Sequence, residues 1–91
     1  MSNYDKYTSM SFDERYSLML HFYNNSVMQF SSAISQSHST VSLWRKYQKI
    51  SPQGALKIEA LKLVTDDGFR LTANWVRPDI NNWNYYKKKY T

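Results

Sequence analysis

Residues 27–44 read VMQFSSAISQSHSTVSLW, and the spacing of their apolar side chains sets the expected fold. In the first half, apolar residues recur at helical intervals, at Met28, Phe30, Ala33 and Ile34. Val41 and Trp44 lie three residues apart, so they share one face of a second helix. The polar run SQSHS at 35–39 separates the two groups. The pattern predicts two short helices, at about 27–34 and about 38–48, joined by a tight turn, a helix-turn-helix.

In a helix-turn-helix the second helix lies in the major groove of DNA, with its first turn at the base edges. This rule predicts that bases are read by His38 and Ser39, and one turn later by Ser42 and Leu43. Serine and histidine hydrogen-bond to base edges, and leucine contacts a thymine methyl group. The alternative for His38 is an exposed side chain that touches only phosphate.

Basic residues continue the same helix, and we expect them to contact phosphates, which supply affinity rather than sequence choice. They are Arg45, Lys46 and Lys49. Gln29, near the start of the first helix of the motif, is expected to hydrogen-bond to a backbone phosphate. The alternative is a solvated charged face. The inward residues of the predicted core are Phe30, Ile34, Val41, Trp44 and Leu56.

The length of 91 residues predicts one small domain, and its charge is unevenly spread. The net charge is +5, but residues 1–36 carry two Lys and Arg against three Asp and Glu. Residues 37–91 carry ten against four. Positive charge that begins with the second helix of the motif is typical of a nucleic-acid-binding protein.

Several classes of protein are disfavoured by composition. The chain has no Cys, so disulfides and thiolate metal sites are excluded, and we expect a cytoplasmic protein. We expect neither a secretion signal nor a membrane-spanning helix, since such a helix needs an apolar run of about 20 residues. The two histidines, His21 and His38, lie 17 residues apart, outside helical metal spacing. With only Gly54 and Gly68 and no phosphate-binding glycine loop, we expect no enzyme and no cofactor.

Further helices are predicted on both sides of the motif. Ser11 and Glu14 form a capping box for a helix over 12–24, preceded by an unpacked arm at 1–11. Ser51 and Pro52 start a helix at 53–64, which has a broad apolar face. Residues 65–68 form a turn. Residues 69–72 are ambiguous: they form a short strand, or Thr72 caps a short helix over 73–76, which we favour. An all-α domain of about five helices is therefore expected at 12–80.

The segment 81–91 is predicted to be an aromatic and basic tail. Its residues 83–90 read WNYYKKKY. It is expected either to grip phosphates or a minor groove, or to stack on single-stranded bases. The alternative is that Trp75 and Trp83 pack at a dimer interface while the lysines stay in solvent. A membrane role is not expected, since three lysines are too few for stable anchoring.

Three segments together resemble the Cro-type phage repressors, and most closely the Cro-like group that includes the YdaS-like antitoxins. They are AISQSHSTVSLWRK at 33–46, ISPQGALKIEAL at 50–61 and VRPDI at 76–80, in family order, and the resemblance spans about 50 of the 91 residues. It implies a lambda-repressor-like fold and a homodimer on a palindromic operator. It matches the base-reading positions above and places Ser37 at the mouth of the groove, near phosphate. Ser35 departs from the family's usual glycine, so a left-handed backbone there would be strained.

Two functions remain open at this point. One is a sequence-specific transcriptional regulator of phage or prophage type that binds double-stranded DNA. The other is an antitoxin or protein-interaction module, which would bind a partner protein through the broad helix at 53–64 or the aromatic tail.

Overall fold

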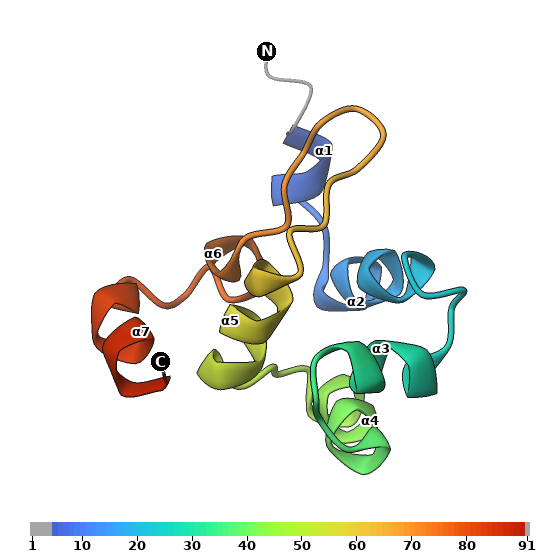
Figure 1. Ribbon diagram of the computed structural model, residues 1–91. Helices are drawn as coiled ribbons and strands as arrows, with labels where there is room; N and C mark the ends of the chain where they lie inside the picture. The colour runs from blue at the N-terminus through green and yellow to red at the C-terminus, as the bar shows by residue number, and fades with distance from the viewer. Residues whose placement is uncertain (1–4, 91) are drawn as a thin grey trace. The chain divides into compact units, whose positions relative to one another are not determined.

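The computed structural model describes residues 5–90 and is mostly helical, so the expected all-α class is confirmed (Figure 1). Seven helices are formed over the described residues, and these residues form no strand beyond one isolated bridge between Val64 and Arg70. The helices are α1 Asp5–Thr8, α2 Phe12–His21, α3 Val27–Ala33, α4 His38–Tyr47, α5 Pro52–Ala60, α6 Ala73–Val76 and α7 Trp83–Tyr90.

The chain divides into two compact units, Met1–Lys49 and Ile50–Thr91. The boundary falls inside the stretch 12–80 that was expected to form a single domain. The first unit contains α1 to α4, and the second contains α5 to α7.

Hydroxyl side chains start the helices at the positions that the sequence indicates. Ser11 and Glu14 form the predicted capping box of α2. Ser37, Ser51 and Thr72 accept hydrogen bonds from backbone N–H groups in the first turns of α4, α5 and α6. Such caps satisfy N–H groups that have no partner within the helix. The favoured helix at 73–76 is confirmed as α6.

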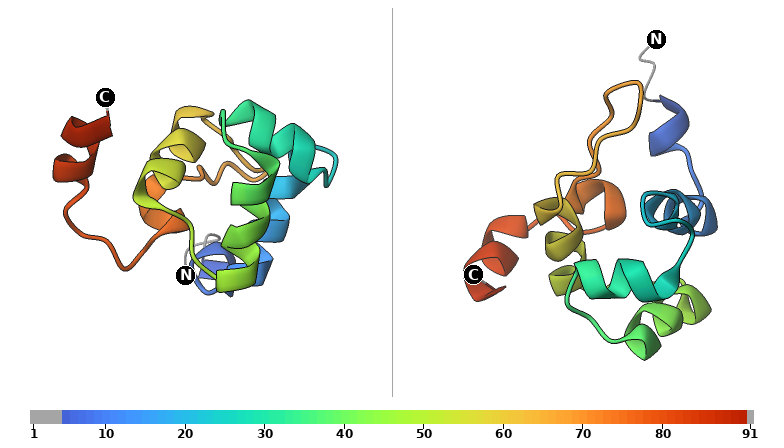
Figure 2. Two further views of the ribbon diagram at one scale, coloured as in Figure 1. Left: turned by 90° about the horizontal axis from the view of Figure 1, so that it is seen from below. Right: turned by 45° about the vertical axis from the view of Figure 1, so that its right-hand side comes forward.

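The core of the first unit is formed by the inward faces of α1, α2, α3 and α4. Its apolar members, each at most 6% exposed, are Tyr7, Tyr16, Met19, Phe30, Ile34, Val41 and Trp44. Phe30, Ile34, Val41 and Trp44 are therefore confirmed as core residues, whereas Met28 and Ala33, which spacing placed on the same apolar face, are exposed. Figure 2 shows α3 and α4 next to each other, joined by a short connection.

Residues 5–11 differ from the expected unpacked arm. Asp5–Thr8 form a helical turn and Tyr7 is 6% exposed. The Arg15 side chain donates hydrogen bonds to the carbonyl oxygens of Thr8 (2.7 Å) and Met10 (3.0 Å). The arginine and the buried ring hold this segment to the unit; residues 1–4 of the expected arm lie outside the described residues.

Two helices end earlier than their apolar patterns suggest. α2 ends at His21 rather than at 24, and Asn24 and Asn25 both have φ of 58°. α5 ends at Ala60 rather than at 64, because Lys62 has φ of 55° and takes the chain out of the helix. Its apolar face is therefore shorter than predicted.

In the second unit, α5 packs against α6 and α7, and a hairpin-like loop connects α5 to α6. The predicted turn at 65–68 is present, with Gly68 N–H donating to the Thr65 carbonyl (2.9 Å). Arg77 donates to both carboxylate oxygens of Asp79 and to the Ile50 carbonyl (2.6 Å). The core includes Ile50, Ala55, Ile58, Leu71, Trp75 and Val76. Leu56, expected in the core, is only partly buried.

The segment 83–90, expected as a tail, forms α7. Trp83 and Tyr86 are partly buried, and their rings meet edge to face at 5.9 Å. The aromatic residues thus give the lysine-rich segment one side that packs, which the composition alone did not reveal. Thr91 lies outside the described residues.

Ser35 has a left-handed backbone, with φ of 55° in the α3–α4 turn, at the position where the family it resembles usually has glycine. A residue with a Cβ atom is strained there by about 1–2 kcal/mol, and glycine is not. We expect Ser35→Gly to raise the free energy of unfolding by about 0.5–1 kcal/mol in urea denaturation, because part of the gain is offset by the freedom of glycine in the unfolded chain.

The matched control is Ser32→Gly, at an exposed position inside α3. It should lower stability by about 0.5 kcal/mol, because glycine is a poorer helix former than serine. Equal destabilisation by the two changes would contradict the strain at Ser35.

Candidate nucleic-acid interface

α4 is buried on one side only. Val41 is 0% exposed and Trp44 is 6% exposed. On the other side, Ser39, Ser42 and Lys46 recur at intervals of three and four residues and are exposed. α3 packs on the inner side. The result is a short helix whose polar and basic side faces solvent.

All nine residues predicted to contact DNA are exposed. They are Gln29 on α3, Ser37 in the turn, Lys49 after α4, and on α4 itself His38, Ser39, Ser42, Leu43, Arg45 and Lys46. Leu43 is 46% exposed, which is unusual for a leucine so close to the core and leaves a methyl group for an apolar contact. The structure therefore places these side chains where an outside molecule can reach them.

Hydrogen bonds across the unit fix the position of α4. The Tyr16 hydroxyl, on α2, donates to the Val41 carbonyl oxygen (3.2 Å) in the buried interior. At the other end, Gln48 caps α4 with φ of 56°, and its Nε2 donates to Asp13 Oδ1 (2.9 Å). Both bonds join residues at least 25 positions apart, and sequence reasoning missed them because no local pattern signals them.

Arg45 differs from Lys46 in its surroundings. Its guanidinium carbon lies 6.0 Å from the centre of the Tyr16 ring, toward α2. Burial raises the pKa of Tyr16 above its ordinary value, and the positive charge of Arg45 opposes this in part. Lys46, also in the last turn of α4, lies on the exposed face, its Nζ 5.5 Å from the centre of the exposed Tyr47 ring. Lys46 is thus the better-placed cation of the two for an outside phosphate.

Two of the predicted phosphate ligands already use part of their hydrogen-bonding capacity. The Ser37 hydroxyl donates to Thr40 Oγ1 (2.8 Å) while it caps α4. The Gln29 side-chain oxygen accepts from Asn24 Nδ2 (3.1 Å), which leaves its NH₂ group to donate. Gln29 therefore fits a phosphate oxygen better than Ser37 does.

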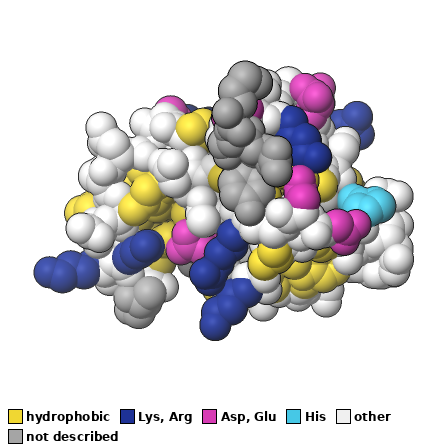
Figure 3. Space-filling model, turned by 90° about the horizontal axis from the view of Figure 1, so that it is seen from above, with side chains coloured by type: hydrophobic (Ala, Val, Ile, Leu, Met, Phe, Trp, Pro, Cys, Tyr) yellow, Lys and Arg dark blue, Asp and Glu magenta, His cyan; other side chains and the backbone are white. Residues whose placement is uncertain are grey.

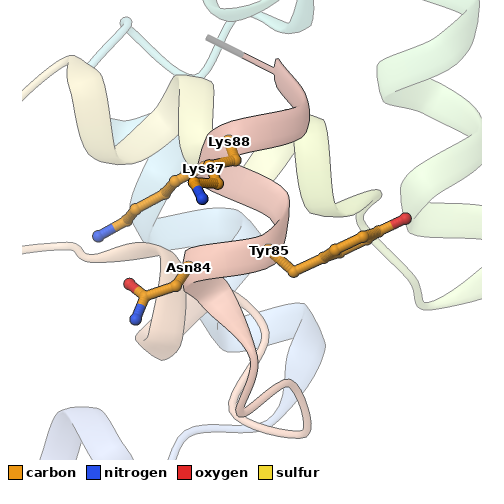
Figure 4. A pocket seen from close by; sticks show the side chains of 4 residues that line it. All are labelled: Asn84, Tyr85, Lys87 and Lys88. Carbon is orange, nitrogen blue, oxygen red and sulfur yellow. The ribbon is translucent and has the colours of Figure 1, made fainter.

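Positive charge alone does not mark the site. Lys and Arg side chains lie at several separate places on the face drawn in Figure 3, with Asp and Glu among them. On α7, Lys87 and Lys88 line a shallow pocket with Asn84 and Tyr85. Figure 4 shows Asn84 and Tyr85 leaving opposite sides of α7. This helix also carries charge, but none of its residues is fully buried, whereas α4 buries Val41 and Trp44.

Other kinds of site find little support in the described part of the chain. Within residues 5–90, no group of three or more His, Cys, Asp or Glu side chains is placed to hold a metal ion. In the same range, no helix has the length and apolar character needed to cross a membrane.

None of the protein-family models, curated proteins or solved structures compared with this chain matches it. The resemblance of residues 30–80 to Cro-type repressors therefore stays a prediction, carried by the three segments quoted above.

The Tyr16–Val41 hydrogen bond gives a test of how α4 is held. We expect Tyr16→Phe to lower the free energy of unfolding by about 1 kcal/mol, because it leaves a buried carbonyl without its partner. Tyr47→Phe, at a ring that is 66% exposed, is the control and should have no measurable effect. Equal stability of the two variants in urea would contradict the role of Tyr16.

The raised pKa of Tyr16 also predicts a pH dependence. The folded protein holds the Tyr16 proton more tightly than the unfolded chain, so the stability that the proton contributes is complete below about pH 10. That contribution is lost as the pH rises through the folded-state pKa. Urea denaturation between neutral pH and pH 11 should therefore show a steeper loss for the parent protein than for Tyr16→Phe. Parallel pH profiles would contradict the prediction.

Proposed function

We propose that this protein is a sequence-specific DNA-binding transcriptional regulator whose α4 helix enters the major groove. One observation carries the proposal: Val41 and Trp44 are buried, while all four predicted base-reading residues of α4 are exposed. An α-helix fits the major groove of B-DNA, where each base pair presents a distinct pattern of donors and acceptors.

In this proposal the residues of α4 divide into two roles. His38, Ser39 and Ser42 hydrogen-bond to base edges, and Leu43 contacts a thymine methyl group. Lys46 and Lys49 make the main phosphate contacts, and Arg45, Gln29 and Ser37 contact phosphates at the edge of the interface. The first group selects the sequence, and the second supplies affinity and register.

The proposed regulator acts as a homodimer in the cytoplasm. This part rests on the resemblance to Cro-type repressors and on the absence of Cys, not on a contact in the structure. Two copies of α4 about 34 Å apart would enter successive major grooves of a palindromic operator. Occupancy of that operator would exclude the polymerase from the promoter.

The first test is a fluorescence-anisotropy titration of the full chain with DNA from immediately upstream of its own gene and with a scrambled duplex, at about 150 mM salt. Binding at least about a hundredfold tighter to the upstream DNA supports the proposal. Equal weak binding to both duplexes would leave only non-specific attraction and would reject it.

Substitutions on α4 should separate sequence selection from affinity. We expect His38→Ala to relax the preference at one base pair in each half-site, a loss of about 1–3 kcal/mol of discrimination. Lys46→Ala should instead weaken binding to all duplexes alike. Lys6→Ala, which removes one charge from α1, serves as the charge-matched control and should change neither property. If His38→Ala and Lys46→Ala lost the same affinity on specific and random DNA, the division of roles would be wrong.

The salt dependence offers an independent measure of the phosphate contacts. Each phosphate that the protein neutralises changes the slope of log affinity against log salt concentration by about 0.9. Lys46→Ala should therefore reduce the slope by about one unit per protomer, whereas His38→Ala should leave it unchanged if that residue contacts only bases. A slope unaltered by Lys46→Ala would show that Lys46 does not contact phosphate.

A further inference from the structure

The second unit contains a groove between α5 and α7, which we call the α5–α7 groove. It has a volume of about 460 Å³ and is lined mostly by apolar surface. Its apolar members are Leu56 and Ala60 on α5 and Tyr90 on α7. A volume in this range accommodates one or two bulky side chains or a small ligand.

The apolar floor of the groove is open because α5 divides its apolar residues between two sides. Ala55 and Ile58 are fully buried in the core of the unit. Leu56 is only partly buried, Ala60 is exposed, and Tyr90 is 38% exposed. Covering these atoms would remove apolar surface from water, which is favourable. Binding of an apolar group in the α5–α7 groove would therefore be favourable.

Positive charges surround this floor. Lys57, Lys62 and Arg70 line the groove and form no ion pair among the described residues. Among the described residues, Glu59 supplies the only carboxylate in the lining. One oxygen of Glu59 accepts from the Ala73 backbone N–H (3.0 Å), and the other lies 3.9 Å from Lys87 Nζ. Glu59 is thus used within the unit, and the rim repels cations and attracts anions.

We propose that the α5–α7 groove binds an acidic segment of a partner protein that carries a bulky apolar side chain. The apolar side chain would lie over Leu56 and Ala60, and flanking carboxylates would pair with Lys57, Lys62 and Arg70. This site goes beyond the proposed DNA-binding function and does not depend on it, because it uses no residue of α3 or α4.

The lining favours an acidic peptide over a nucleic-acid backbone. A phosphate backbone needs cations but no apolar floor, and its phosphates attract charged side chains on any exposed surface. An amphipathic peptide uses both features, since its apolar residue fills the groove and its acids meet the rim. Tyr90 is the one residue of the groove on which a base could stack, so single-stranded DNA is a competing occupant in the test.

The test uses the full ¹⁵N-labelled chain and a synthetic peptide of about ten residues, made of Glu and Asp around a central Leu-Phe pair. Two control peptides replace either Leu-Phe by Ser-Ser or all acids by Gln and Asn. We expect the first peptide to bind with a dissociation constant on the order of 10–100 µM. Its binding should shift amide resonances of α5 and α7 and leave those of α4 in place. Each control peptide should bind at least about tenfold more weakly.

Variants connect the binding to the groove. Ala60→Trp should fill the groove and weaken binding about tenfold or more, while the double variant Lys57→Gln/Arg70→Gln should weaken it without changing the packing. Lys6→Gln, outside the groove, removes one positive charge and should bind as the parent does. All three variants should keep the parent's affinity for DNA, so failure here and failure of the DNA-binding proposal remain distinguishable.

Several results would overturn the inference. They are no resonance shift at about 1 mM peptide, equal binding of the Ser-Ser control, and unchanged affinity in the double variant. Tighter binding of an oligothymidine of equal charge, with the same shifts in α5 and α7, would assign the groove to single-stranded nucleic acid and reject the acidic peptide.

Discussion

Burial of Val41 and Trp44 fixes the rotation of α4 about its own axis, and the candidate interface follows from it. Each large apolar side chain contributes about 1.5–3 kcal/mol when it leaves water. A half-turn of the helix would expose both and would bury serines and a lysine without partners, which costs free energy again. The hydrogen bond from the Tyr16 hydroxyl to the Val41 carbonyl oxygen holds the same side of α4 against α2. The face that carries Ser39, Ser42 and Lys46 therefore points outward because of what lies behind it.

The starts of the helices could be predicted from the sequence, because they depend on local chemistry. Ser11, Ser37, Ser51 and Thr72 each cap the first turn that follows them. A helix of ten residues or fewer is marginal by itself in water, so a cap and one buried face decide whether it forms. Both signals lie within a few residues in the chain. For the same reason the exposure of the nine candidate DNA contacts could be predicted from spacing alone.

The ends of α2 and α5 and the long-range contacts could not be predicted. Gln48 and Lys62 end α4 and α5 in left-handed backbone, a conformation that neither residue type favours. Both residues adopt this unfavourable backbone conformation because the chain beyond each helix runs in a different direction. The bonds Tyr16–Val41 and Gln48–Asp13 join distant positions through tertiary packing. The helix α7 was not predicted, because the lysines of this segment suggested a solvated tail. Its packing depends instead on Trp83 and Tyr86, which are partly buried.

The same type of charge has a different meaning on α4 and in the α5–α7 groove. On α4, Lys46 accompanies hydroxyl and imidazole groups on a convex face, a combination that suits phosphates and base edges. In the groove, Lys57 and Arg70 border an apolar floor, a combination that a phosphate backbone does not use. Each surface is built within a single unit, from its own helices and its own core. Because the two surfaces share no residue, a change of charge in one leaves the chemistry of the other intact, and their ligands can be assigned separately.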